Sequence, residues 1–175
     1  MAESALTKKI KVALYKYSKA HLLGVYGAFE VVMGSSTCGY GHEYVDFVTM
    51  DSDNVFRCYE IKVSVEDLHS KAQLSFYGDF NFVVVPDEKL VPGLLGEALG
   101  FVTGTFGNKA GVLVYHELVD GTSYFSVASR AKRQNVRIEQ RIANMHNMVR
   151  SGSRYTTKYV KSLPEFSAVG PVDVL

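Results

Sequence analysis

Two carboxylates and a lysine near the middle of the chain have the types and spacing of a metal-dependent hydrolytic site. Glu60 and Lys62 stand two residues apart in the β-type run 55–63, so both side chains are expected on one face of a strand. Asp46 lies in the preceding β-type run, before the turn 51–54. If the two strands pair as a meander, Asp46 comes close to Glu60, and all three charges lie on a largely apolar sheet.

A cluster of this kind is costly to bury unless it binds a charged partner. Mg²⁺ prefers oxygen ligands, is typically held by one or two carboxylates, and keeps several waters. A cation held there polarises a phosphodiester and neutralises the charge that develops on it. Lys62 would orient the attacking water or stabilise that charge. We therefore expect an enzyme, a phosphodiesterase that uses Mg²⁺ or Mn²⁺.

The elements that must position these groups follow from hydrophobic periodicity and turn signals. Helices are predicted over 4–23, 65–77 and 128–149, and strands over 29–34, 44–50, 55–63, 80–86, 111–116 and 124–128. Segment 87–108 is expected to be loop or short helix. The near-continuous apolar run 80–86 is typical of a buried strand, and the strand–helix–strand order before it indicates a βαβ crossover. The fold class predicted is α/β (α+β), a mixed central sheet flanked by helices.

The chain resembles the PD-(D/E)XK nuclease superfamily, which has a restriction-endonuclease-like fold. The resemblance rests on Asp46, a gap of thirteen residues, then Glu60-Ile61-Lys62, with Glu30 upstream. Residues 4–86 match the αβββαβ core of that superfamily, and the strings 59–68 and 81–86 are similar to the MmcB-like DNA-repair branch and to related phage nucleases. Val45 stands where the motif's name has proline.

The resemblance implies roles for individual residues. Asp46, Glu60 and the Ile61 carbonyl would ligate the metal, and Lys62 would assist the nucleophile. Glu30 would be an additional catalytic acid or metal ligand, and Gln73 a supporting polar residue. It also implies a deoxyribonuclease that works in DNA repair, recombination or phage DNA metabolism.

The charge of the chain is unevenly distributed. Residues 127–163 hold nine Lys and Arg against Glu139 alone, whereas residues 1–126 hold ten basic and fifteen acidic residues. Such a segment suits the phosphate backbone of a nucleic acid. The predicted DNA contacts are Arg130, Lys132, Arg133, Arg137, Arg141, Arg150, Arg154 and Lys158. We expect a nuclease-like core over 1–135 and a basic helical C-terminal extension over 136–175.

Composition narrows the class of protein. Hydrophobic residues make up 47% and charged residues 21%, which suits a globular domain. No apolar run reaches the roughly 18 residues of a membrane span, and the N-terminus lacks the order of a signal peptide. We therefore expect a cytoplasmic protein without membrane contact. Cys38 and Cys58 form no zinc pattern and are expected to be reduced.

Simpler interpretations compete with each of these predictions. Glu60 and Lys62 would form an exposed cross-strand ion pair with Asp46, Glu30 would be a surface residue, and the basic segment a solvated helix face. His42 and His69 are expected to be solvent-facing rather than general bases. The alternative function is a nucleic-acid-binding accessory protein that keeps the nuclease fold without turnover, and a third is an interaction module of a phage or mobile element. Cleavage mode, the choice between DNA and RNA, strandedness and homo-oligomer formation stay open.

Overall fold

The structure is a computed structural model that describes residues 4–21, 25–33, 43–70, 77–107 and 109–162. Its helices are α1 (Ala5–His21), α2 (Val65–Leu68), α3 (Leu94–Phe106) and α4 (Ile138–Ser162). Its strands are β1 (Tyr26–Met33), β2 (Glu43–Met50), β3 (Phe56–Ile61), β4 (Phe80–Pro86), β5 (Gly111–Glu117) and β6 (Ser123–Ser129).

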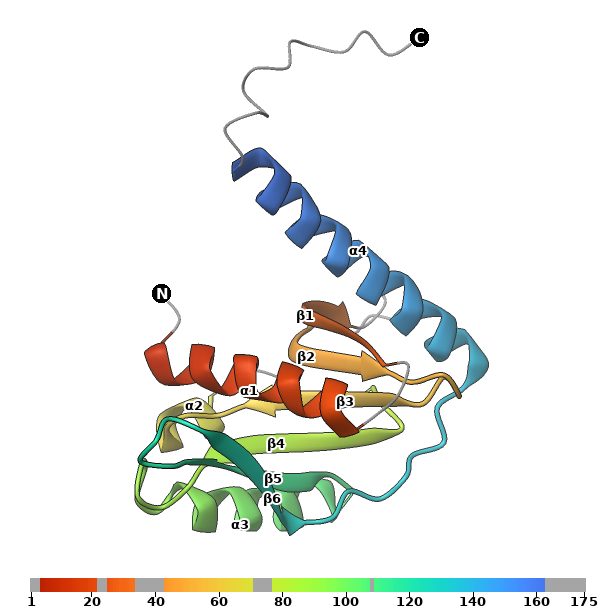
Figure 1. Ribbon diagram of the computed structural model, residues 1–175. Helices are drawn as coiled ribbons and strands as arrows, with labels where there is room; N and C mark the ends of the chain where they lie inside the picture. Colours follow the sequence, from red (N-terminus) through yellow and green to blue (C-terminus); the bar gives the residue numbers. More distant parts are fainter. Residues whose placement is uncertain (1–3, 22–24, 34–42, 71–76, 108, 163–175) are drawn as a thin grey trace, which may run out of the picture.

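The strands of the described residues form one sheet in the order β1-β2-β3-β4-β5-β6 (Figure 1). β3 pairs parallel with β4 and β4 pairs parallel with β5, and the remaining neighbours are antiparallel. The predicted meander, the βαβ crossover and the mixed sheet flanked by helices are confirmed. The element order over 4–86, helix, three strands, helix and strand, is also as predicted.

Both faces of the sheet are covered by helices. On one face, Ile10 and Leu14 of α1 pack against Phe47, Tyr59 and Leu113. The intervening residues point to the other face. There α3 packs on β4 and β5, and Met148 of α4 packs on β1, β2 and β3. Figure 1 shows the far half of α4 extending beyond the sheet.

The second helix begins as the sequence predicts. The Ser64 hydroxyl accepts the backbone N–H of Asp67 at 3.1 Å, which caps the first turn, and Glu66 and Asp67 stand in that turn. The predicted length is wrong within the described residues, because α2 ends at Leu68. The rest of the predicted helix, 71–76, lies outside them.

The predicted helix over 128–149 is wrong at both ends. Strand β6 runs to Ser129, and residues 130–137 form neither helix nor strand. Backbone bonds explain this: Lys132 donates to the Lys109 carbonyl at 3.0 Å and Gln134 donates to the Asp79 carbonyl at 2.7 Å, so both N–H groups are used by other segments. Helix α4 then continues past the predicted stop at Ser151-Gly152. Segment 87–108 likewise holds a longer helix than expected, the 13-residue α3.

Candidate functional site

Asp46 on β2 is held by the neighbouring strand. Its Oδ2 accepts the backbone N–H of Ile61 at 2.8 Å, so this carboxylate is fixed at the carboxyl end of β3. Burial raises the pKa of Asp46 above its ordinary value, although the Ile61 hydrogen bond and the charges of Lys11 and Lys62 act in the opposite direction. Asp46 therefore lies where a carboxylate is costly and a cation would offset the cost.

Glu60 shares that position with Asp46. Glu60 is only 4% exposed, and its Oε1 has no hydrogen-bond partner in the described part of the chain. Burial raises the pKa of Glu60 well above its ordinary value, the negative charge of Asp46 raises it further, and Lys62 lowers it in part. Two neighbouring acids that are withdrawn from water raise the pKa of one another in this way.

Lys62 follows β3 directly and is also buried. Its backbone N–H donates to the Val84 carbonyl at 2.9 Å, which continues the parallel pairing beyond the strand end. Its Nζ lies 3.5 Å from Oδ1 of Asp67, and the lysine side chain is 7% exposed. The Asp67 carboxylate also lies 3.4 Å from the Val63 nitrogen, so the start of α2 holds the lysine beside the acids.

Glu30 lies on β1 between two residues that pair with β2, since Phe29 is opposite Phe47 and Val31 is opposite Val45. Its backbone has φ +49°, a left-handed conformation that interrupts the strand. The carboxylate lies 3.2 Å from Lys11 Nζ. Burial acts to raise the pKa of Glu30, but the hydrogen bonds of Lys11 and Tyr155 and the charges of Lys11 and Lys158 outweigh it, and the pKa is lowered. The Glu30 charge is thus offset by Lys11 of α1 and by Lys158 of α4.

The two carboxylates at this site, those of Asp46 and Glu60, suit a divalent cation. Within the described residues, no three His, Cys, Asp or Glu side chains gather closely enough to hold a metal ion. Asp46 and Glu60 are a pair, which is the number of carboxylates that Mg²⁺ typically uses. Glu60 Oε1 has no hydrogen-bond partner among the residues that the structure describes, and this is the observation that fits a cation. The Ile61 carbonyl was predicted as a further ligand. The Ile61 N–H donates to Asp46, so the backbone of Ile61 lies beside the carboxylate pair.

Three charged neighbours of this site were not predicted, namely Lys11, Asp67 and Glu43, whose negative charge raises the pKa of Glu60. Lys11 pairs with Glu30 and its charge also acts on Asp46, while Asp67 pairs with Lys62. The Ser64-x-x-Asp67 cap pattern places Asp67 one turn from Lys62 and could have identified it. Lys11 carries no such signal, because only the packing of α1 on the sheet brings it there.

The predicted nucleic-acid contacts divide into three groups. Arg130, Lys132, Arg133 and Arg137 are exposed in the segment before α4, and Arg150 and Lys158 are exposed on α4. Arg154 donates to the Glu30 carbonyl at 2.9 Å. Arg141 is committed to the protein, since its guanidinium pairs with the buried carboxylate of Asp79 and reaches the Asn54 carbonyl at 2.7 Å. Gln73 lies outside the described residues.

Comparison with known proteins finds similarity in fold. No protein-family model matches the chain, and no curated protein matches it. The solved structure of SPO1766, a protein of unknown function from Silicibacter pomeroyi, is similar with a TM-score of 0.62 and 16% identity, over 94% of this chain and 96% of that one. SfsA of Pyrococcus furiosus, solved in complex with Ca²⁺, gives a TM-score of 0.32 and 16% identity over 74% of this chain and 64% of that one.

The shared fold with SPO1766 assigns no activity, and membership of the PD-(D/E)XK superfamily stays a prediction. Among the described helices, none is both long and apolar enough to cross a membrane.

Proposed function

We propose that this chain is a metal-dependent phosphodiester hydrolase that acts on DNA. The observation that carries the proposal is the half-buried Asp46 beside the buried Glu60, whose Oε1 has no hydrogen-bond partner among the described residues, with the buried Lys62 beside them. A purely structural ion pair would match each charge with a partner. Here Lys62 already pairs with Asp67, and Lys11, whose charge also acts on Asp46, pairs with Glu30.

Each residue has a part in this proposal. Asp46 and Glu60 would hold Mg²⁺ or Mn²⁺, and the Ile61 N–H keeps Asp46 turned toward Glu60. The bound cation supplies a Lewis acid that polarises the phosphodiester and offsets its charge. The Lys62 ammonium, held by Asp67, orients the attacking water and stabilises negative charge on the phosphate oxygens.

The raised pKa values of the two acids support cation binding in a way that can be measured. A cation requires deprotonated ligands, so it competes with protons for Asp46 and Glu60. Mn²⁺ binding should therefore release protons and weaken as the pH falls. Glu30 supports the site indirectly, because it shares the Lys11 charge with Asp46.

The test is cleavage of end-labelled single-stranded and duplex DNA with Mg²⁺, Mn²⁺ or EDTA. Wild type should cut with either metal and not with EDTA, and Asp46→Asn, Glu60→Gln and Lys62→Met should each lower the rate at least about a hundred-fold. The matched controls are Glu66→Gln and Lys16→Met, which alter exposed residues of the same types. They should cut like wild type.

Titration of Mn²⁺ by calorimetry separates binding from turnover. Wild type and Lys62→Met should bind the cation, whereas Asp46→Asn and Glu60→Gln should bind it at least about ten-fold more weakly. DNA binding without any cleavage would favour the accessory protein over the enzyme. Cleavage that persists in EDTA or in Asp46→Asn would overturn the assignment of the site.

A further inference from the structure

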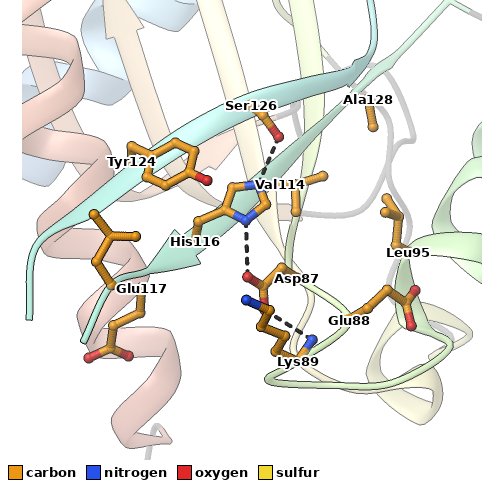
Figure 2. Close-up of a pocket in the computed structure, with 11 residues that line it drawn as sticks. Asp87, Glu88, Lys89, Leu95, Val114, His116, Glu117, Tyr124, Ser126 and Ala128 are labelled. Atoms are coloured by element: carbon orange, nitrogen blue, oxygen red, sulfur yellow. Dashed lines mark hydrogen bonds and ion pairs between the residues drawn. The ribbon is translucent and has the colours of Figure 1, made fainter.

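Asp87, His116 and Ser126 form a continuous hydrogen-bonded chain that the proposed nuclease site does not use (Figure 2). Ser126 Oγ lies 2.8 Å from His116 Nε2, and His116 Nδ1 lies 3.0 Å from Asp87 Oδ2. The three side chains line a cavity of about 460 Å³. Leu113 and Tyr115 face α1, so the alternating His116 faces the opposite side of the sheet.

The sheet fixes the geometry of this chain of residues. In the β5–β6 pairing, His116 is opposite Tyr124, two residues from Ser126, so histidine and serine project from neighbouring strands on one face. The backbone N–H of Asp87 donates to the Tyr115 carbonyl at 2.9 Å, which ties the turn after β4 to β5. The Tyr124 ring stacks on the imidazole with centroids 4.6 Å apart and an interplanar angle of 13°.

The Asp87 carboxylate is oriented by its own turn. Its Oδ1 accepts the backbone N–H groups of Lys89 at 3.2 Å and Leu90 at 3.1 Å, which leaves Oδ2 for His116. A carboxylate only accepts hydrogen bonds, so His116 donates its Nδ1 proton to Asp87. In the neutral ring Nε2 then holds the lone pair and accepts the Ser126 hydroxyl proton. This is the order in which an acid, a base and a nucleophile act in acyl transfer.

We propose that Ser126 is the nucleophile of a second site, independent of the proposed nuclease activity, which hydrolyses uncharged carboxylic esters. Ser126 Oγ bonds to the ester carbonyl carbon while its proton passes to His116 Nε2. The alcohol leaves with that proton when the ester C–O bond breaks, and an acyl-serine remains. Water then bonds to the acyl carbon and gives a proton to Nε2. The acyl–Oγ bond breaks, the carboxylic acid leaves, and the proton returns to Ser126.

The cavity lining indicates the class of ester. Apolar side chains form one part of it, those of Leu95, Val114, Leu118 and Ala128. The charged residues that line it are three acids, Asp87, Glu88 and Glu117, and one base, Lys89. Glu117 also pairs with Lys9 at 2.6 Å. The excess of acids repels phosphate esters and other anions, whereas an uncharged ester with a short apolar acyl chain meets no such repulsion.

The test uses the full chain in EDTA, so that it does not depend on the metal site. A fluorophosphonate probe should label Ser126, identified by peptide mass spectrometry, and p-nitrophenyl butyrate should be hydrolysed. Ser126→Ala, His116→Gln and Asp87→Asn should each lower hydrolysis at least about a hundred-fold. Ser129→Ala, which removes a hydroxyl on the same strand, and Asp46→Asn should leave labelling and hydrolysis unchanged.

Labelling of the native wild type at Ser126 tests the proposal without any variant, so a variant that fails to fold does not decide it. If Ser126 reacts no faster than Ser129, or no faster than in the urea-unfolded chain, the proposal is overturned. It is also overturned if Ser126→Ala hydrolyses the ester at the wild-type rate. Loss of DNA cleavage in Asp46→Asn with ester hydrolysis intact would show that the two sites are separate.

Discussion

Glu60 is buried next to Asp46, and Asp46 accepts a backbone N–H, that of Ile61 at 2.8 Å, which offsets its charge. Glu60 Oε1 has no such partner in the described part of the chain. The two acids therefore differ in how costly their ionisation is, and Glu60 carries the larger cost because the charge of Asp46 adds to its burial. This asymmetry makes Glu60 the better probe of the site in the absence of metal.

Glu60→Gln should stabilise the metal-free protein at neutral pH. The pKa of Glu60 is raised in the folded state, so the unfolded chain loses its proton first, and wild-type stability falls as pH rises above about 4.5. Glutamine does not ionise, so the variant keeps the stability that wild type loses as the pH rises. Thermal unfolding in EDTA should show a Tm rise of roughly 2–4 °C at pH 7.5, equivalent to about 1 kcal/mol, and no difference near pH 4.

Glu139→Gln is the control for that measurement, because Glu139 is exposed. The expected order reverses when the cation is added, since Mg²⁺ stabilises only a protein that binds it. Wild type should gain Tm with Mg²⁺ and Glu60→Gln should not. A Glu60→Gln variant that is less stable than wild type at pH 7.5 in EDTA would contradict the cost assigned to this carboxylate.

Asp67 is expected to position Lys62 rather than to contact the substrate. Its carboxylate lies 3.5 Å from Lys62 Nζ and 3.4 Å from the Val63 nitrogen. Asp67→Asn keeps the shape and removes the charge that holds the ammonium. DNA cleavage should fall about ten-fold in kcat with Mn²⁺ affinity unchanged, because the metal ligands stay in place. Equal loss of metal affinity and of kcat would instead make Asp67 a ligand.

Several parts of this structure were predictable because they depend on local chemistry. The run Phe80–Pro86 is apolar throughout most of its length and forms strand β4 at the predicted residues. Ser64 begins a helix because its hydroxyl accepts a hydrogen bond from a backbone N–H of the first turn, that of Asp67. The approach of Asp46 to Glu60 followed from two strands joined by a short turn, since a meander leaves few other registers.

Other parts depend on contacts between distant segments, which periodicity does not contain. The stretch 130–137 has helix-forming residues, but its N–H groups bond to Lys109 and Asp79. His116 and Ser126 form no motif, because Asp87 meets them only after β4, β5 and β6 have paired. The role of Arg141 was hidden for the same reason, as its partner lies 62 residues earlier in the chain.

Arg141→Gln should destabilise the protein more than any other change in the basic segment. Asp79 is buried, with a side chain only 1% exposed, and besides Arg141 it accepts the Phe56 N–H at 2.9 Å. Loss of the guanidinium leaves a buried carboxylate without its main counter-charge, at a cost of about 3–5 kcal/mol in the free energy of unfolding. Urea unfolding should show this loss, and the double variant Asp79→Asn, Arg141→Gln should recover part of it.

The matched control is Arg137→Gln, four residues earlier and exposed, for which a change within about 0.5 kcal/mol is expected. Arg133 Nε lies 3.9 Å from Asp79 Oδ1 on a side chain that is 63% exposed, so it is a weak substitute for Arg141. If Arg141→Gln unfolded at the wild-type urea concentration, Arg141 would be available for DNA after all.

The salt dependence of DNA affinity tests the remaining cations. Arg137, Arg150 and Lys158 are exposed, and removing one cation that neutralises a phosphate should reduce the slope of log affinity against log salt by about 0.9. Neutralising all three to glutamine should therefore reduce the slope for duplex DNA by up to about three times that amount, as measured by fluorescence anisotropy in EDTA. The control neutralises Lys8, Lys16 and Lys89, which are exposed outside this segment and carry the same total charge. An equal change in both triple variants would show that net charge alone attracts the DNA, and an unchanged slope in the first would exclude these residues from the interface.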